Sequence, residues 1–321
     1  MKRRSVLKAV LAAGLLSATG IAHGAGAESV KVAVGQRGNW DTAVAELGQK
    51  AGIFKKQGLE LEILYTQGGG ETQQAVISGS ADVGVAAGTL GVLGAFSKGA
   101  PVRILGAQAT GAADFWYVRA DSKLKTVKDV GDDTTVAYST NGSSTHSIVL
   151  AFQKDLGMKG KLTATGSPPA TFTQVMSGQI DVGWSSPPFG FDAIDENKIR
   201  ILARANDAKL VHGTTIRTLI TNAAALESKK DTLAKFMKAY RETVDWMYQG
   251  EEPLKSYAAF AKCTEAQAKR IRDEFFPKEL IDPDKVAGLD KLMEDAVSFK
   301  TIAAPLSAEQ QRQLIQIPPR S

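Results

Sequence analysis

An internal repeat at an offset of 99 residues limits the possible folds of this chain more than any other feature. Seven residues recur in order, as Thr72, Val76, Ser78, Gly79, Asp82, Val83 and Gly84 and again as Thr171, Val175, Ser177, Gly178, Asp181, Val182 and Gly183. Each copy has the pattern of a helix that ends at a Gly and leads into a short apolar strand. The repeat therefore predicts an α/β protein with two similar lobes and a cleft between them.

Both copies run into loops of small residues. Ala87, Gly88 and Thr89 follow the first apolar strand, and Ser185 and Ser186 follow the second. Ligands of open α/β sheets bind outside the carboxyl ends of the strands. We therefore expect these two loops to face each other across the cleft and to contact a ligand. The alternative is that they are ordinary turns, since helix-Gly-strand junctions are common.

Residues 1–27 have the pattern of a secretory signal peptide. Lys2, Arg3, Arg4 and Lys8 precede an apolar run over 9–22, and small residues at 25–27 provide a cleavage site. The apolar run is too short to span a bilayer, which takes roughly 20 residues. The paired arginines also fit a twin-arginine signal, and the route of export is left open. We expect a periplasmic protein, and no cysteine follows the signal to carry a lipid anchor.

Charge and composition exclude several classes of function. The formal charge is +5, but the signal holds four basic and no acidic residues, so the mature chain is close to neutral. No basic cluster with interleaved aromatic residues suggests nucleic acid. Cys263 is the sole cysteine and cannot form an internal disulfide. His146 and His212 lack further ligands at metal-binding spacing, so we expect neither a metal nor a cofactor.

Alternation and helical spacing predict strands and helices in regular succession. Strands are expected at 30–35, 59–65, 102–106, 115–118, 135–138, 162–165, 180–184, 199–203 and 215–221, and helices at 42–50, 90–97, 147–156, 169–177, 264–276, 282–298 and 307–316. The strands at 115–118 and 215–221 are expected to cross between the lobes as a hinge. The expected lobes are 28–115 with 222–321, and 116–221.

Two segments are the main candidates for holding a ligand. Asn141, Gly142, Ser143, Ser144 and Thr145 precede a helix, and the amides of a helix N-terminus together with hydroxyl groups favour an anion. A simple helix cap is the alternative. Gly69 and Gly70 begin the first repeat helix, where glycine allows either close approach of a ligand or a flexible turn.

Single residues with aromatic or charged side chains add weaker candidates. Trp40 and Trp184 could provide flat apolar walls, although a core position fits Trp184 equally well. Arg37 and Arg217 could each pair with an anion, but a structural ion pair is the stronger interpretation for Arg217. His146 has no identifiable acid partner, and no residue is predicted to be catalytic.

The ordered motifs resemble a known family. The runs at 51–60, 68–70, 78–84 and 98–102 resemble periplasmic solute-binding proteins of ABC importers. The branch is the one for sulfonates, taurine and nitrate, which is akin to the thiamine-pyrimidine precursor proteins. The resemblance covers nearly all of the mature chain. It implies the second type of periplasmic-binding fold, with closure of two lobes on a ligand.

The resemblance also implies partners. A protein of this family is a monomer that delivers a small solute to a membrane permease driven by a cytoplasmic ATPase. Family contacts transfer to the loop around Trp40, to Gly69 and Gly70, and to the segments 87–89, 141–145 and 185–186. Two other functions remain open: an enzyme of the thiamine-pyrimidine type on the same fold, and a sensor component that presents its closed form to a receptor.

Overall fold

The computed structural model describes residues 27–320. The expected signal segment, apart from its last residue, lies outside this range. The strands are β1 Glu28–Val34, β2 Leu59–Tyr65, β3 Val83–Gly88, β4 Val102–Thr110, β5 Phe115–Arg119, β6 Thr135–Tyr138, β7 Lys161–Ala164, β8 Gly183–Ser185, β9 Ile199–Arg204 and β10 Thr215–Asn222. The helices are α1 Val44–Lys50, α2 Ile53–Lys56, α3 Gly69–Ile77, α4 Thr89–Ser97, α5 Ser144–Leu156, α6 Pro168–Met176, α7 Phe191–Asp195, α8 Ala223–Ser228, α9 Lys230–Met247, α10 Glu252–Ala261, α11 Glu265–Arg270, α12 Leu289–Ser298 and α13 Ala308–Leu314.

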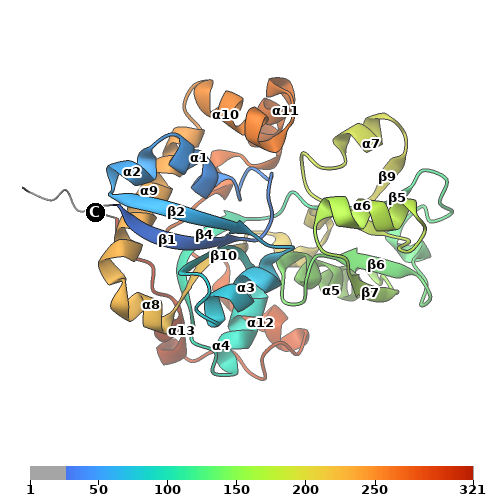
Figure 1. The fold of residues 1–321 in the computed structure, drawn as a ribbon. Helices are drawn as coiled ribbons and strands as arrows, with labels where there is room; N and C mark the ends of the chain where they lie inside the picture. Colours follow the sequence, from blue (N-terminus) through green and yellow to red (C-terminus); the bar gives the residue numbers. More distant parts are fainter. Residues whose placement is uncertain (1–26, 321) are drawn as a thin grey trace, which may run out of the picture.

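The first sheet has five strands in the order β2-β1-β3-β10-β4. β1 runs parallel to β2 and β3, whereas β10 runs antiparallel to β3 and β4. Helices cover both faces, with α1, α2 and α9 on one side and α3, α4 and α12 on the other (Figure 1). Alternate strand residues therefore enter different cores: Val32 and Val34 pack on the α9 side and Ala33 on the α3 side.

The second group of strands repeats this arrangement. β5 lies between β8 and β9 and is antiparallel to both, and β6 pairs in parallel with β7. A bridge between Val136 and Val182 joins the two sheets, with the Ala137 amide donating to the Val182 carbonyl over 2.8 Å. The combined order is β7-β6-β8-β5-β9, which matches the first sheet strand for strand. The expected two-lobed α/β fold is thus present.

The repeated residues make the same hydrogen bonds in both copies. The hydroxyls of Thr72 and Thr66 lie 2.8 Å apart, and those of Thr171 and Thr165 lie 2.6 Å apart. Each of the two apolar strands follows an Asp with an equivalent bond. Asp82 accepts from the Lys31 amide over 3.0 Å, and Asp181 accepts from the Thr135 amide over 2.8 Å. The 99-residue offset is therefore a repeat of structure as well as of sequence.

The strands expected to cross between the lobes lie within single sheets. β5 pairs only with strands of the second group and β10 only with strands of the first. The connections between the groups are residues 111–114 and 205–214, the second of which contains two 3₁₀ turns. The hydrophobic alternation of 115–118 and 215–221 identified strands correctly, but alternation does not reveal which sheet a strand joins.

The C-terminal third is helical, with two departures from expectation. The segment 264–276 is α11 followed by a π-helical turn over Ile271–Phe275. The segment 282–298 is helical only from Leu289, after Gly288 adopts a left-handed φ of 63°. The left-handed Gly288 interrupts any helix that would run through 282–298, so α12 begins after it. Among residues 27–320, none of the helices combines the length and hydropathy needed to cross a bilayer.

Candidate functional site

The segment 139–145 forms a polar turn that opens helix α5. The Ser143 hydroxyl accepts from the His146 amide over 3.1 Å and caps the helix. The Thr145 hydroxyl accepts from the Ser139 amide over 2.9 Å, which fixes the preceding turn. Since first-turn amides have no partner within a helix, α5 presents hydrogen-bond donors at Ser144 and Thr145.

Ser144 and Thr145 line a small cavity, here called the inner cavity, at the junction of the two sheet systems. Its volume is about 10 Å³, which is the room that a single water needs. Its walls come from both halves of the fold: Gly35, Gln36, Asn39, Thr42, Gly69, Ala86, Asp114, Ser139, Ser144, Thr145 and Arg217. The carboxyl ends of β1, β3 and β6 lead into it, as expected for a ligand site in an α/β fold.

Arg217 of β10 forms hydrogen bonds to three segments around the inner cavity. Its Nη1 donates to Asp41 Oδ2 over 2.8 Å, and its Nη2 donates to Asp114 Oδ2. Its Nε donates to the Ser144 hydroxyl over 3.1 Å. The guanidinium thus links the first sheet, the connection 111–114 and the start of α5. The structural ion pair expected for Arg217 is present, but the residue also forms part of the cavity wall.

This cluster contains two carboxylates and one guanidinium, all almost fully buried. Burial raises the pKa of Asp114 and the Asp41 carboxylate adds to that rise, while Arg217 opposes it. Burial works against the charged form of Arg217, but Asp114 and Asp41 outweigh it and raise the pKa of the guanidinium. Arg217 is therefore charged at every physiological pH, and the cluster has an excess of negative charge when both carboxyls are ionised.

Glycines let the two halves approach at the backbone level. A Cβ on Gly70 would lie 2.0 Å from the Asn141 carbonyl oxygen, and one on Gly88 would lie 2.6 Å from that of Gly142. The Gly70 amide donates to the Thr140 hydroxyl over 3.0 Å. Close packing of 140–144 against the starts of α3 and α4 is therefore the reason these positions carry no side chain.

Other expected site residues in the first sheet lie beside the inner cavity. Ala87 pairs with Thr218 in the sheet, and the Thr89 hydroxyl donates to the Thr215 carbonyl over 2.6 Å. Trp40 stacks edge-on against Tyr257 and donates from Nε1 to the Tyr248 hydroxyl. Its role is to anchor the loop that carries Gln36 and Asn39.

Ser185 and Ser186 do not meet Ala87–Thr89 across the cleft as expected. A Cβ added to Gly88 would meet atoms of Gly142, Ser143 and Ser144. The Ser185 hydroxyl donates to the Phe189 carbonyl over 2.9 Å, while that of Ser186 is buried without a protein partner. We expected the loops 87–89 and 185–186 to lie opposite each other because they follow equivalent strands. Instead, the polar turn at 139–145 lies opposite the loop 87–89.

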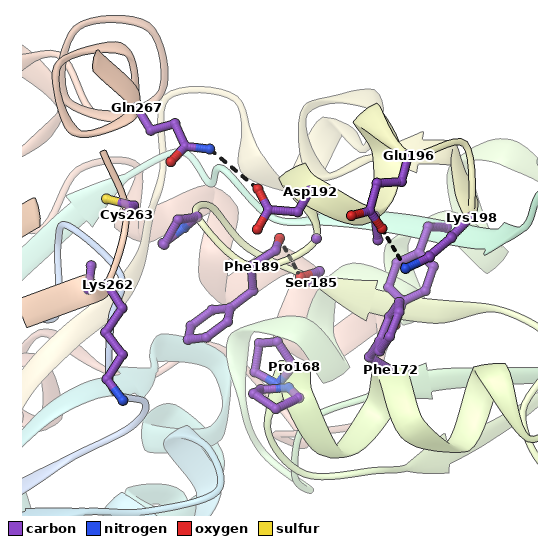
Figure 2. Close-up of a pocket in the computed structure, with 16 residues that line it drawn as sticks. Pro168, Phe172, Ser185, Phe189, Asp192, Glu196, Lys198, Lys262, Cys263 and Gln267 are labelled. Carbon is purple, nitrogen blue, oxygen red and sulfur yellow. Dashed lines mark hydrogen bonds and ion pairs between the residues drawn. The ribbon is translucent and has the colours of Figure 1, made fainter. Parts of the chain in front are cut away.

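Ser185 lines a second and larger space, here called the outer pocket. Figure 2 shows its wall, with Phe189, Pro168 and Phe172 on one side and Lys262 and Cys263 on the other. Gln267 and Asp192 approach across it with an Nε2 to Oδ1 distance of 3.5 Å. The Phe189 ring would lie 3.0 Å from a Cβ on Gly38, so it reaches the loop that borders the inner cavity.

His146 has a structural role. Its ring stacks on Tyr138 with centroids 4.4 Å apart, and its Nδ1 accepts from the Gly142 amide. Burial lowers the pKa of the imidazole. Within residues 27–320, no three His, Cys, Asp or Glu side chains are grouped to hold a metal ion.

Sequence reasoning missed Asn39 and Asp114 as parts of the cavity wall. Both are 1% exposed; Asp114 stands between apolar residues, whereas Asn39 lies in the polar run 36–42. For Asp114 a signal was available in principle, because an Asp among apolar neighbours needs a partner when buried, and Arg217 is the one charged residue of the buried strand β10.

A match to the sequence model of a known family shows which family the chain belongs to. The sequence model of the family described as NMT1/THI5 like matches residues 40–253. The chain belongs to the NMT1/THI5-like family. This confirms the family resemblance drawn from the motifs. Comparison with curated protein sequences gives no match.

Several solved structures match across most of the chain. The alkanesulfonate-binding protein SsuA from Xanthomonas axonopodis pv. citri bound to MOPS has a TM-score of 0.71 and 17% identity, covering 91% of this chain and 96% of that one. SsuA from Escherichia coli gives 0.66 and 18%, covering 92% and 94%. The nitrate-binding protein NrtA from Synechocystis PCC 6803 gives 0.64 and 13%, covering 89% and 84%. The chain thus has the fold of periplasmic ABC-type substrate-binding proteins.

Proposed function

We propose that this protein is the solute-binding component of an ABC importer and acts in the periplasm. It captures a small anionic solute, such as an organic sulfonate, taurine or a nitrate-like ion, between two lobes that close about a hinge. It then delivers the solute to a membrane permease powered by a cytoplasmic ATPase. The protein acts as a monomer and is not an enzyme.

The inner cavity is the observation that carries this proposal. It lies where two similar α/β units meet, and Ser144 and Thr145 at the start of the 13-residue helix α5 line it. A helix N-terminus with unpaired amides favours an anion. The proteins of similar structure are described as binding sulfonates and nitrate.

We propose lobe boundaries based on which strands pair. They differ slightly from the boundaries expected from the sequence, which were 28–115 with 222–321 for one lobe and 116–221 for the other. The first lobe comprises residues up to about 110 and from 215 onward, because β10 pairs with β3 and β4. The second lobe lies between the two connections, residues 111–114 and 205–214. We propose these connections as the hinge.

The candidate site residues divide into three groups by their proposed role. Gly69, Ser144 and Thr145 form the cavity wall and contact the solute directly. Gly70, Gly88 and residues 141–143 permit the lobes to close, while Trp40, Ala87, Thr89, Ser185 and Ser186 support the surrounding loops.

Thermal unfolding of the mature protein with a ligand panel tests the proposal. The panel contains alkanesulfonates, nitrate, carboxylates, pyrimidines and amino acids. A ligand at 100 times its dissociation constant stabilises the folded state by about 2.7 kcal/mol, which raises the unfolding midpoint measurably. We expect a sulfonate or another small anion to raise it. A panel without any such shift would refute the anionic solute.

A further inference from the structure

The outer pocket has a size that suits an organic molecule. Its volume is about 460 Å³, within the range of roughly 300–1,000 Å³ that is usual for small-molecule sites, whereas the inner cavity has about 10 Å³. The two spaces share no lining residue. Most of the outer wall is apolar and comes from α6, α7 and the loop before α7: Pro168, Pro169, Phe172, Pro188, Phe189 and Ala193 (Figure 2). An apolar ligand can therefore bury much of its surface here.

The charged groups around the outer pocket balance each other. Glu196 pairs with Lys198 over 2.5 Å, and Asp192 accepts from Gln267. Lys262 is exposed to solvent and extends away from Asp192 in Figure 2. Since the lining holds two carboxylates and two ammonium groups, it has no net charge to attract an ion. The pocket therefore suits an uncharged ligand.

Tyr117 of β5 contributes a polar group without a partner to this wall. The residue is 1% exposed, and its hydroxyl makes no hydrogen bond within residues 27–320. Burial raises the pKa of Tyr117, so the hydroxyl stays protonated and can donate. Leaving a buried hydroxyl unpaired is costly. A ligand that offers one acceptor to Tyr117 would remove this cost.

The internal repeat indicates that the fold does not require this hydroxyl. Tyr117 lies opposite Gly183 in the second unit, and Ile220 lies opposite the equivalent Gly84 in the first. A Cβ on Gly183 would lie 2.5 Å from Tyr117 Cζ, and one on Gly84 would lie 2.8 Å from Ile220 Cγ1. The two side chains thus pack against equivalent glycines. Because an aliphatic side chain suffices in the first unit, packing does not explain the hydroxyl in the second.

We infer that the outer pocket is a second ligand site, which binds an uncharged aromatic molecule whose single carbonyl group accepts a hydrogen bond from the Tyr117 hydroxyl. The rings of Phe172 and Phe189 provide the contacts that favour an aromatic ligand. The site is separate from the inner cavity, so the inference does not depend on the anionic solute of the proposed function.

Four bicyclic probes of similar shape test the chemical class of the ligand. They are indane, 1-indanone, indane-1-carboxylate and 1-aminoindane, titrated into the mature protein and followed by NMR. 1-Indanone differs from indane by one carbonyl oxygen, and the other two probes carry a negative and a positive charge. Because one neutral hydrogen bond is at stake, we expect 1-indanone to bind about fivefold tighter than indane, and tighter than both charged probes. Binding of 1-indanone no tighter than that of indane, tighter binding of a charged probe, or no binding of any probe would overturn the inference.

Cys263 reports whether 1-indanone binds in this pocket. It lines the outer pocket and is the only cysteine of the chain, so the rate of alkylation by iodoacetamide measures the accessibility of this one thiol. We expect saturating 1-indanone to slow the alkylation at least threefold. An unchanged rate would place the probe elsewhere and refute the assignment.

Tyr117→Phe removes only the hydroxyl, and thermal unfolding checks that the variant is folded. We expect it to bind 1-indanone no more tightly than indane. Tyr240→Phe is the matched control, because the Tyr240 hydroxyl is also buried without a partner within residues 27–320 but does not line the pocket. It should keep the fivefold preference. A preference that persists in Tyr117→Phe, or that disappears in Tyr240→Phe, would contradict the role of Tyr117.

Discussion

Replacing Gly70 by Ala should obstruct closure of the two halves without harming either of them. Its added Cβ would lie 2.0 Å from the Asn141 carbonyl oxygen and 2.9 Å from the Thr140 hydroxyl. Since Cβ atoms do not approach other heavy atoms closer than 3.0 Å, the turn at 140–142 must move away from α3 by about 1 Å. This displacement opens the wall of the inner cavity.

The expected magnitude follows from the cost of overpacking. A well-packed contact that receives an extra methyl group typically loses about 1–3 kcal/mol. If only the closed form holds the solute, as we propose, this cost appears in the apparent affinity, which should weaken by roughly 5- to 150-fold. The isolated helix should not suffer, because Ala is more favourable than Gly within a helix by up to about 1 kcal/mol.

Two measurements separate an effect on solute binding from an effect on the stability of the fold. They are calorimetric titration with the best solute of the panel and thermal unfolding of the unliganded protein. Gly131→Ala is the control, because a Cβ there meets nothing within 4 Å. We expect weak binding with a nearly unchanged midpoint for Gly70→Ala, and wild-type behaviour for Gly131→Ala. Wild-type affinity in Gly70→Ala would refute the reasoning, since the backbone contact would then have no part in closure.

Two further predictions concern the cluster around Arg217 and the cap of α5. Arg217→Met leaves the buried carboxyls of Asp41 and Asp114 without a cation, and the free energy of unfolding should fall by about 3–5 kcal/mol in denaturant titration. Since the pKa of Asp114 is raised and Arg217 opposes that rise, the folded state prefers the protonated acid, and the loss should be larger at pH 8 than at pH 5. A loss independent of pH would argue against the ionised carboxyls as its cause. Ser143→Ala removes the bond from the His146 amide and should cost about 1 kcal/mol, which Ser143→Asp should restore; equal stability of both variants would rule out the cap.

The repeat made the architecture predictable from sequence. Thr72 and Asp82 recur as Thr171 and Asp181 because the same bonds to a neighbouring strand are needed in both units. Selection for a shared local geometry leaves a pattern at a fixed offset. The family resemblance from the motifs agrees with the family match over residues 40–253.

The chemistry of the inner cavity was less predictable. Arg217 lies 176 residues from Asp41 and 103 from Asp114, and no local pattern joins them. The polar turn at 141–145 was identifiable because a helix N-terminus has a local signature, and Ser144 and Thr145 do line the cavity. Asn39 has no such signature, because its position depends on how Trp40 anchors its loop against Tyr248 and Tyr257.

The place of β10 in the first sheet has a consequence for the order in which the chain can fold. β10 lies between β3 and β4, although more than a hundred residues separate it from β4 along the chain. As the polypeptide is synthesised, β3 and β4 present unpaired edges until residue 222 emerges, and such edges invite aggregation. The segment between the connections has all its strands in one continuous stretch, so the middle of the chain can fold before its beginning is complete.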